Sequence, residues 1–456
     1  MKISIAKSSE SKPGILLAAA FGIAMAFVTL RVLPLGEKNV LFLLALPVAA
    51  LFFLLVIVDV KLALILLLFS RASLDYALGL TRVDILGQSI GLGGGINLAV
   101  LILALVLVIQ RPEALFENPV SKRWIVYLLI CSIAVVYSPV PGRGVRLFLN
   151  LLSYYCMLTI PFILINRIED QRFWLKVLLF STILPVCLAN IDLLRGGAEF
   201  HDAGMRLQGT FPHPNILAFY LVFAIALVFY TLQCKLFSLT TAKRNLLRIY
   251  LLDLFILLVA TKSRNGWLAC WGLFFLYGLL KDRRWFLYSF IVPLPALLVP
   301  SIRERILDVF GSYDLADTEH LNSFAWRLRL WKDSLLTLKK TFLFGNGLSS
   351  FEFLVEGFSE WDERFGAHNT YLEVLVETGL LGIAAYAGIY SGLLKTFFTK
   401  MRATAGPLSA GYALLFCYAG SYAVVCLGDN MLYYLSFNWY FWFFIGVMAR
   451  CAQLGI

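Results

Sequence analysis

The stretch Ile216–Leu232, which reads ILAFYLVFAIALVFYTL, decides the fold of this chain. It carries no charged side chain, and its length is close to the roughly 20 residues with which an α-helix crosses a ~30 Å hydrocarbon layer. Within lipid, the backbone hydrogen bonds of such a stretch can be satisfied only in a helix or a closed barrel. Because further blocks of this kind follow along the chain, the sequence predicts an all-α, polytopic membrane helical bundle.

The composition agrees with a chain solvated largely by lipid. Of its 456 residues, 60% are hydrophobic and 15% are charged, and the mean hydropathy is +0.81. Soluble domains are nearer half apolar and a quarter charged. The additional apolar residues fall in blocks long enough to cross or nearly cross a membrane, and these blocks predict about 12–14 transmembrane helices. The predicted spans are Gly14–Leu30, Val40–Val58, Leu62–Leu80, Ile96–Ile109, Trp124–Ser138, Leu147–Ile165, Trp174–Leu194, Ile216–Leu232, Leu246–Ala260, Trp267–Leu280, Trp285–Val299, Tyr371–Leu394, Leu408–Leu427 and Met431–Met448.

The short loops predict the orientation. With the N-terminus inside, the inner loops collect Lys and Arg, as the positive-inside rule requires, and an even number of spans returns Arg450 to the inside. Gly14–Leu30 is too long for a signal-peptide core and is expected to remain as the first span. The net charge of +11 would point to nucleic acid in a soluble protein. Here we expect membrane lipids as partners and no nucleic acid, in a bacterial inner (plasma) membrane.

Three segments are expected along the chain: a first part of the bundle (1–299), a periplasmic loop domain with an amphipathic helix (300–370), and the C-terminal membrane helices (371–456). The amphipathic helix is predicted from apolar residues spaced three and four apart, namely Phe324, Leu328, Trp331, Leu335, Leu338 and Phe342. We expect this apolar stripe to lie on the membrane or over the bundle. The glycines between Gly87 and Gly95 are expected to form a flexible loop.

No metal or other cofactor is predicted. The eight Cys lie in or beside apolar segments, where they are expected to pack as small apolar residues rather than form disulfides. No Asp-x-Asp pair lies near the outer loops, and no His/Cys cluster has the spacing of metal ligands.

The predicted outer side is unusually rich in Arg, and it contains all four His residues of the chain. An outward cluster of guanidinium groups suggests a phosphate-rich ligand, because their fork matches phosphate oxygens. The alternative is salt bridging to Asp and Glu or to lipid headgroups.

The first outer motif runs from Arg206 to Asn215 and includes Pro212-His213-Pro214. Pro and Asn here suit the start of a helix, whose free N–H groups would favour an anion. Alternatively, the prolines only shape a loop. In a second motif, Arg264 lies among small polar residues and resembles a phosphate clamp. It could equally be an interfacial anchor beside Trp267.

The third motif contains His368-Asn369. Thr370 and Glu373 have capping-box spacing, which predicts a helix start and places His368 just before it. The helix end and nearby Arg would keep the imidazole neutral, able to accept a proton from a sugar hydroxyl; the alternative is a structural His. Inside predicted spans, Arg71 is a functional candidate by default, and Asp253 is given no role.

The order and spacing of these motifs resemble the O-antigen ligase/polymerase superfamily. The resemblance covers roughly Arg206 to Ala385 and rests on Arg206…Gly209-Thr210-Phe211…Pro214-Asn215, Ser263-Arg264, Arg327…Trp331, Gly345-Asn346-Gly347, His368-Asn369 and Gly379-Leu380-Leu381-Gly382. It implies a GT-C type membrane glycosyltransferase that takes a glycan from undecaprenyl diphosphate at the periplasmic face.

The resemblance also implies roles for single residues. His368 would be the catalytic group at the acceptor hydroxyl, and Arg206, Arg264, Arg71 and Arg327 would bind the diphosphate. Asn369, His213 and Asn215 would support the acceptor or the site. Since fixed guanidinium charges can stabilise a diphosphate leaving group, we expect metal-independent, inverting transfer.

Three readings of the function stay open. The ligase pattern commonly ends Gly-x-x-Gly with Thr, whereas this chain has Ile383-Ala384, so a polymerase of O-antigen or exopolysaccharide units is favoured over a ligase that attaches the glycan to lipid A–core. A flippase for lipid-linked glycans is the rival from another class, but its usual internal repeats are not evident. The acceptor glycan or lipid A–core, and a chain-length regulator, are the further candidate partners.

Overall fold

The computed structural model describes residues 55–456, except 57, 82, 86–87, 201–203, 235, 308–322, 359–365 and 456. This part of the chain is mainly helical, which confirms the predicted all-α class. Seven of the described helices are long and apolar enough to cross a membrane, so the protein is a multi-pass membrane bundle. The predicted span Gly14–Leu30 and nearly all of Val40–Val58 lie outside the described residues, and the total number of spans stays a prediction.

The described helices of the first half are α3 Val60–Leu80, α4 Leu92–Gln110, α5 Ala114–Glu117, α6 Ser121–Val136, α7 Pro141–Leu164, α8 Ile168–Ser181, α9 Ile183–Leu194 and α10 Pro214–Gln233. Those of the second half are α11 Thr241–Ala260, α12 Arg264–Leu280, α13 Arg283–Ile291, α14 Pro300–Leu307, α15 Ser323–Leu336, α16 Phe351–Phe358, α17 Thr370–Ala403, α18 Gly406–Val425 and α19 Leu435–Leu454. Short 3-10 turns are η2 Leu294–Leu298, η4 Thr337–Lys339 and η5 Met431–Tyr433. Two antiparallel hairpins pair β1 Val83–Ile85 with β2 Gln88–Ile90, and β3 Ala198–Phe200 with β4 Gly204–Arg206.

Helices α10 and α19 form the centre of the bundle. Nearly all of their side chains are buried, as expected for helices that are hydrophobic on every side. Helix α19 packs along α7, while α17 packs against α18 and α6. By contrast, α11 exposes Leu246, Ile249 and Leu252 on one face, which suits contact with lipid.

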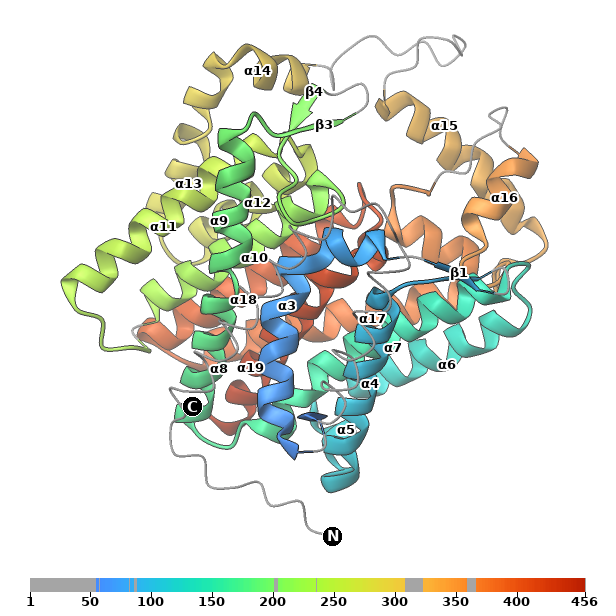
Figure 1. Cartoon of the computed structure of the whole chain (residues 1–456), viewed down its shortest axis with the longest axis horizontal. Coiled ribbons are helices and arrows are strands. Elements are labelled where there is room, and N and C mark those ends of the chain that lie inside the picture. Colours follow the sequence, from blue (N-terminus) through green and yellow to red (C-terminus); the bar gives the residue numbers. More distant parts are fainter. Residues whose placement is uncertain are drawn as a thin grey trace.

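The two ends of the bundle differ in character. At one end, Glu117 forms ion pairs with Arg111 at 2.6 Å and with Arg450 at 3.0 Å, which ties the end of α4 to the end of α19. These residues belong to the loops predicted to be inside. Helices α14, α15 and α16 lie in the upper part of Figure 1, and α5 and the C-terminal end lie in the lower part.

One predicted span is not the continuous helix that the sequence suggested. Trp285–Val299 was expected to be continuous, but α13 ends at Ile291 and the 3-10 turn η2 follows. Pro293 and Pro295 lie in this interval, and proline cannot continue a helix because it lacks the N–H group and clashes with the preceding turn. The nine residues of α13 span only about 14 Å, which is too short to cross a membrane.

The predicted amphipathic helix exists as α15, and its apolar stripe is divided between a small core and the outer surface. Leu338 of the stripe is buried in a small separate core with Leu330, Phe351 and Val376, and Trp331 packs against this core, whereas Leu328 and Leu335 are exposed. The segment therefore packs through Leu330, Trp331 and Leu338, and the expectation that the exposed part of the stripe lies on the membrane stays a prediction.

A kink in α17 explains the glycine motifs. Gly379 has φ +67° inside the helix, a region that other residues rarely adopt. The kink frees backbone N–H groups, and that of Leu380 donates to Phe342 O at 2.8 Å. Gly345 packs so closely there that a Cβ would lie 2.4 Å from the Glu377 carbonyl carbon. Both glycine motifs thus join the α15–α16 segment to α17.

The predicted flexible glycine loop is also corrected. Gly93–Gly95 form the first turn of α4 rather than a loop before it. Glycine is unfavourable within a helix but tolerated near its start, and the apolar run that follows continues the helix.

Candidate functional site

Three helix starts converge at one end of the bundle. The caps are His213 for α10, Ser263 for α12 and Asn369 for α17, and each side chain accepts a hydrogen bond from a backbone N–H of its own first turn. Side-chain caps of this kind fix where a helix begins. The predicted helix starts after His213 and His368 are therefore confirmed, although the cap of α17 is Asn369 rather than Thr370.

Asp429, in the loop between α18 and α19, connects these helix starts. Its carboxylate is 1% exposed. It accepts hydrogen bonds from Asn215 Nδ2 at 2.9 Å, Asn265 Nδ2 at 3.2 Å, Tyr434 OH at 2.5 Å and the Asn430 N–H at 2.9 Å. A buried carboxylate with four donors is held in one orientation, so it fixes the positions of the helices around it.

Asn215 extends the network to Arg206. Its Oδ1 accepts hydrogen bonds from Arg206 Nη2 at 3.1 Å and from Ser263 Oγ at 2.9 Å. Arg206 is 6% exposed, and its Nε donates to Thr261 O at 3.0 Å. The guanidinium is therefore held beside the starts of α10 and α12.

Helix α17 joins the network through its first residue. Thr370 Oγ1 donates to Asp429 O at 2.8 Å and accepts from the Met431 N–H at 2.9 Å. This bridging explains why Thr370 is not the cap. From α15, Arg327 Nη1 donates to Gly428 O at 3.3 Å, which brings a second guanidinium beside Asp429.

His368 lies directly before the Asn369 cap. Its φ of +47° is uncommon outside glycine, and such strain often occurs at functional sites. Its ring and that of Trp326 are arranged edge to face, with ring centroids 6.0 Å apart. Its Nδ1 is buried and has no hydrogen-bond partner among the described residues.

The surroundings keep the His368 imidazole neutral at pH 7. Burial, then the charge of Arg327, lowers its pKa from 6.5 to about 4, and the Asp429 carboxylate opposes this shift. Burial and Arg206 also lower the pKa of His213. His213 Nδ1, however, already accepts the Asn215 N–H at 3.1 Å. His368 Nδ1 thus has no hydrogen-bond partner among the described residues, whereas His213 Nδ1 has one.

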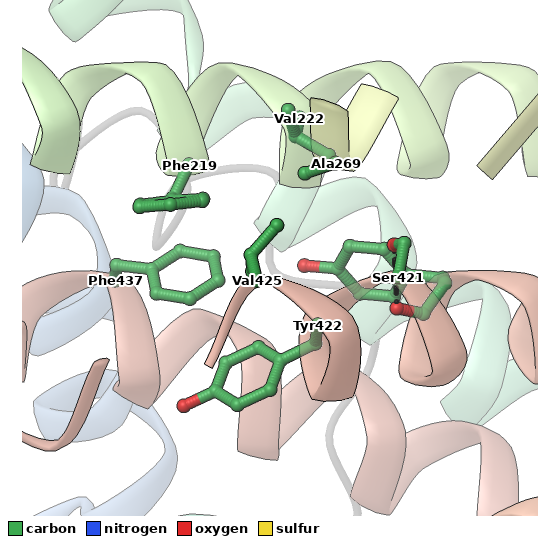
Figure 2. A pocket seen from close by; sticks show the side chains of 8 residues that line it. Phe219, Val222, Ala269, Ser421, Tyr422, Val425 and Phe437 are labelled. Carbon is green, nitrogen blue, oxygen red and sulfur yellow. Dashed lines mark hydrogen bonds between the residues drawn. The ribbon is translucent and has the colours of Figure 1, made fainter. Parts of the chain in front are cut away.

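The packing below the network is apolar and tight. Figure 2 shows Phe219, Val425, Tyr422 and Phe437 around a small space between α10, α12, α18 and α19. Phe219 lies one helical turn from Asn215 in α10. The cavity measures about 10 Å³, which leaves room for one water at most. With so little water beneath it, the network keeps its electrostatic strength.

The structure brings together most of the residues predicted from the sequence. Arg206, His213, Asn215, Arg327, His368 and Asn369 belong to the same end of the bundle and are linked as described above. Arg264 is the first residue of α12, between the network residues Ser263 and Asn265. Arg71 lies outside the network, in an ion pair with Asp75 at 2.8 Å.

Sequence reasoning missed Asp429, Asn265 and Tyr434. A signal for the first was present, since Asp429 is the only acidic residue after Glu377. A single carboxylate in a long apolar stretch is a functional candidate. Its Asn215 and Asn265 partners come from helix starts far away in the sequence, which no local pattern reveals.

The arrangement can bind an anion and accept a proton. Guanidinium groups and helix starts both favour phosphate, and a neutral imidazole with a free nitrogen can accept a proton from a hydroxyl group. Within the described residues, no group of three or more His, Cys, Asp and Glu side chains could hold a metal ion.

Comparison with known proteins supports the resemblance found in the motifs. Residues 249–387 match the family model described as O-antigen ligase. This stretch contains Ser263-Arg264, Arg327, both glycine motifs and His368-Asn369, so the predicted superfamily is confirmed. None of the curated proteins matches the chain.

Proposed function

We propose that the protein transfers a glycan from undecaprenyl diphosphate to a sugar hydroxyl, because residues 249–387 of this membrane bundle match the O-antigen ligase family model. The site faces the periplasm of a bacterial inner membrane. The observation that carries the proposal is the position of His368, whose buried Nδ1 is unpartnered among the described residues and lies where Arg327 and Asp429 both act on its charge.

The diphosphate is bound by fixed positive charge. Arg206 donates to Thr261 O and Arg327 donates to Gly428 O, so both guanidinium groups are held at the Asp429 network, and Arg264 begins α12 between two members of it. Guanidinium groups can form paired hydrogen bonds to phosphate oxygens. They stabilise the charge that develops on the leaving diphosphate, which is the role of a preorganised electrostatic site.

The transfer step needs one proton acceptor. The acceptor hydroxyl oxygen forms a bond to the anomeric carbon as the bond from this carbon to the diphosphate oxygen breaks. The electron pair leaves with the diphosphate, the hydroxyl proton passes to His368 Nδ1, and the configuration at the anomeric carbon inverts. His368 later releases the proton to solvent.

Binding of the donor would make His368 a stronger base. In the free protein, Arg327 contributes to the low pKa of His368, about 4. The negative charges of a bound diphosphate would offset Arg327 and raise this pKa towards its ordinary range. The imidazole would thus become basic when the donor is in place, which ties proton transfer to a loaded site.

Asp429 has a positioning role in this scheme. It holds Asn215 and Asn265 at the starts of α10 and α12, and Thr370 bonds to its backbone. The helix starts that surround the diphosphate and the helix that carries His368 therefore share one anchor. A small displacement of this anchor would misplace both the leaving group and the base.

The acceptor distinguishes two forms of the reaction. In a polymerase of O-antigen or exopolysaccharide units, it is a second glycan, and in a ligase it is lipid A–core. We favour the polymerase because Ile383-Ala384 replaces the Thr that commonly ends the ligase motif.

The test uses the purified full chain with a lipid-linked glycan and either acceptor. A longer lipid-linked glycan indicates the polymerase, and glycan on lipid A–core indicates the ligase. The released lipid diphosphate should appear in equal amount. If the protein forms no covalent product with either acceptor but moves the lipid-linked glycan across vesicles, it is a flippase and the proposal fails.

A further inference from the structure

A hollow of about 260 Å³ lies between the start of α8, the end of α10 and the start of α18. Gln171, Cys234 and Pro407 are among the residues that line it. Helix α10 separates this hollow from the Asp429 network, because Asn215 belongs to its first turn and Cys234 is its C-cap. The 20 residues of α10 place its two ends about 30 Å apart. The hollow is therefore a separate feature, at the other end of the bundle.

The hollow lies at the depth where helices leave the membrane. Three candidate membrane spans have an end here, namely Ile168–Leu194, Pro214–Gln233 and Gly406–Val425. Gln171 is in the first turn of the first span, Cys234 directly follows the second, and Pro407 is in the first turn of the third. The polar headgroup region of a bilayer begins where the apolar part of a span ends. A ligand in this hollow would thus lie among the lipid headgroups.

The lining offers both an acceptor and donors of hydrogen bonds. Gln171 is 2% exposed, and its Oε1 is buried with no hydrogen-bond partner among the described residues. The terminal torsion of Gln is soft, so this amide can turn towards a donor in the hollow. The N-cap of α18 is Ala405, which provides no side-chain hydrogen bond, and the first N–H groups of a helix have no acceptor within it. A ligand with a hydroxyl group and phosphate oxygens would match both.

Two basic side chains border the hollow. Arg172 Nε donates to O of the lining residue Leu236 at 3.0 Å, and Lys281 Nζ donates to Ser409 Oγ at 2.5 Å. Both side chains are exposed, and neither forms an ion pair within the described part of the chain. Topology alone places basic residues at the inner ends of spans. A hollow between such residues, however, is the arrangement that binds anionic lipid headgroups.

We propose that this hollow binds the headgroup of an anionic phospholipid that carries a free hydroxyl group, such as phosphatidylglycerol. Arg172 and Lys281 attract the phosphate, and a headgroup hydroxyl donates to Gln171. The volume is just below the roughly 300–1,000 Å³ of pockets that enclose drug-sized ligands. It therefore suits a headgroup whose acyl chains stay in the bilayer. The proposal is independent of the transfer reaction, which concerns the other end of the bundle.

Filling the hollow tests the proposal, with the same substitution elsewhere as a control. Cys234 lines the hollow, whereas Cys187 is exposed on α9. Native mass spectrometry of the full chain measures bound phosphatidylglycerol, and thermal unfolding in detergent checks that Cys234→Phe and Cys187→Phe fold. We expect Cys234→Phe to weaken binding at least tenfold and Cys187→Phe to change it less than twofold. Equal binding by the wild type and folded Cys234→Phe would overturn the proposal.

Lys281→Gln tests the charge at the border, and Lys122→Gln is its control. Both remove one positive charge from a loop predicted to be inside, but Lys122 belongs to the first turn of α6, which does not line the hollow. A basic side chain near anionic lipid changes the affinity about fivefold. We therefore expect about fivefold weaker binding of phosphatidylglycerol in Lys281→Gln and a change below twofold in Lys122→Gln. Equal losses in the two variants would contradict a local headgroup site.

A zwitterionic lipid tests the choice of headgroup. Phosphatidylcholine has no net charge and no headgroup hydroxyl, so it should bind the wild type at least tenfold more weakly than phosphatidylglycerol. Equal binding of the two lipids would overturn the assignment of an anionic headgroup.

If Cys234→Phe does not fold, the thiol of the wild-type chain provides the test. Cys234 is partly exposed, and a headgroup in the hollow would cover it. Phosphatidylglycerol should then slow alkylation of Cys234 by N-ethylmaleimide at least fivefold, as measured by peptide mass spectrometry, whereas phosphatidylcholine should not. Alkylation at the same rate with either lipid would overturn the proposal. Because none of these measurements uses a glycan, their outcome does not depend on the proposed transfer.

Discussion

Replacing Asp429 by Asn tests the anchor of the site with a change of a single atom. All four groups bonded to the carboxylate are donors: Asn215 Nδ2, Asn265 Nδ2, Tyr434 OH and the Asn430 N–H. The new amide has one oxygen and one NH₂ group, so the NH₂ group must face two donors. Hydrogen bonds to a charged group contribute about 1.5–3 kcal/mol each, which makes the loss of two worth about 3–6 kcal/mol.

Rearrangement reduces this cost. The side-chain amide of Asn265 can turn its oxygen towards the new NH₂ group, although it then gives up its 2.7 Å bond to Gly428 O. Asn215 cannot turn without losing the bonds from Arg206 and Ser263. If one neutral bond is recovered, about 2–4 kcal/mol remains. When this loss appears in the transition state, kcat falls about 30- to 1,000-fold.

The two kinetic constants should respond differently to Asp429→Asn. Loss of the carboxylate removes a negative charge beside Arg206 and Arg327, so the KM for the lipid-linked donor should stay the same or decrease. Since Asp429 opposes the lowering of the His368 pKa, its loss also weakens the base and lowers kcat further.

The control is Asp253→Asn in α11. Asp253 accepts one hydrogen bond, from Asn190 Nδ2 at 3.0 Å, and lies outside the network. Glycan transfer by the purified proteins is measured with donor concentration varied, together with thermal unfolding. Asp253→Asn should leave kcat unchanged. If Asp429→Asn retains at least half of the wild-type kcat, the reasoning about the anchor is refuted.

Three further predictions follow from the geometry. The pKa of His368 is about 4 in the free protein and the neutral form is the base, so kcat/KM should be constant from pH 8 down to pH 6 and fall only at lower pH. A midpoint of this fall at pH 6.5 or above would contradict the prediction. If a bound diphosphate offsets Arg327, kcat should fall at a higher pH than kcat/KM does. Gly379→Ala should lower the free energy of unfolding by about 3 kcal/mol or more. Backbone strain contributes about 1–3 kcal/mol, and the new Cβ would clash at 2.3 Å with the Leu343 carbonyl. Unfolding in denaturant measures this loss, and the control Gly94→Ala should be neutral or stabilising. Since guanidinium groups supply the charge, EDTA should leave the transfer rate unchanged, and restoration of a lost rate by Mg²⁺ would show that a metal takes part.

The membrane helices could be predicted because each depends on local composition. An apolar run such as Ile216–Leu232 must be helical wherever it packs, and α10 covers it. The failures occur where local features interrupt the run. Pro293 and Pro295 end the helix expected over Trp285–Val299, and the kink at Gly379 depends on a partner loop that is distant in the sequence.

The site was predictable in its parts but not in its connections. Arg206, Asn215 and His368 could be selected because they flank helix starts, where donors and charge gather. Asp429 could not be assigned a role, because its importance comes from donors on α10, α12 and α19 that meet only in the folded chain. The burial of Leu330 was missed for a similar reason, since its core partners Phe351 and Val376 come from α16 and α17.

The central claim is that the His368 imidazole accepts the hydroxyl proton while guanidinium groups hold the diphosphate. The most direct measurement compares His368→Gln with the wild type, recording donor binding and single-turnover glycan transfer on the same sample. We predict that binding of the lipid-linked donor changes less than twofold and that transfer falls at least a hundredfold, within the range typical of general-base loss. A His368→Gln protein that binds the donor and transfers glycan at the wild-type rate would contradict the account.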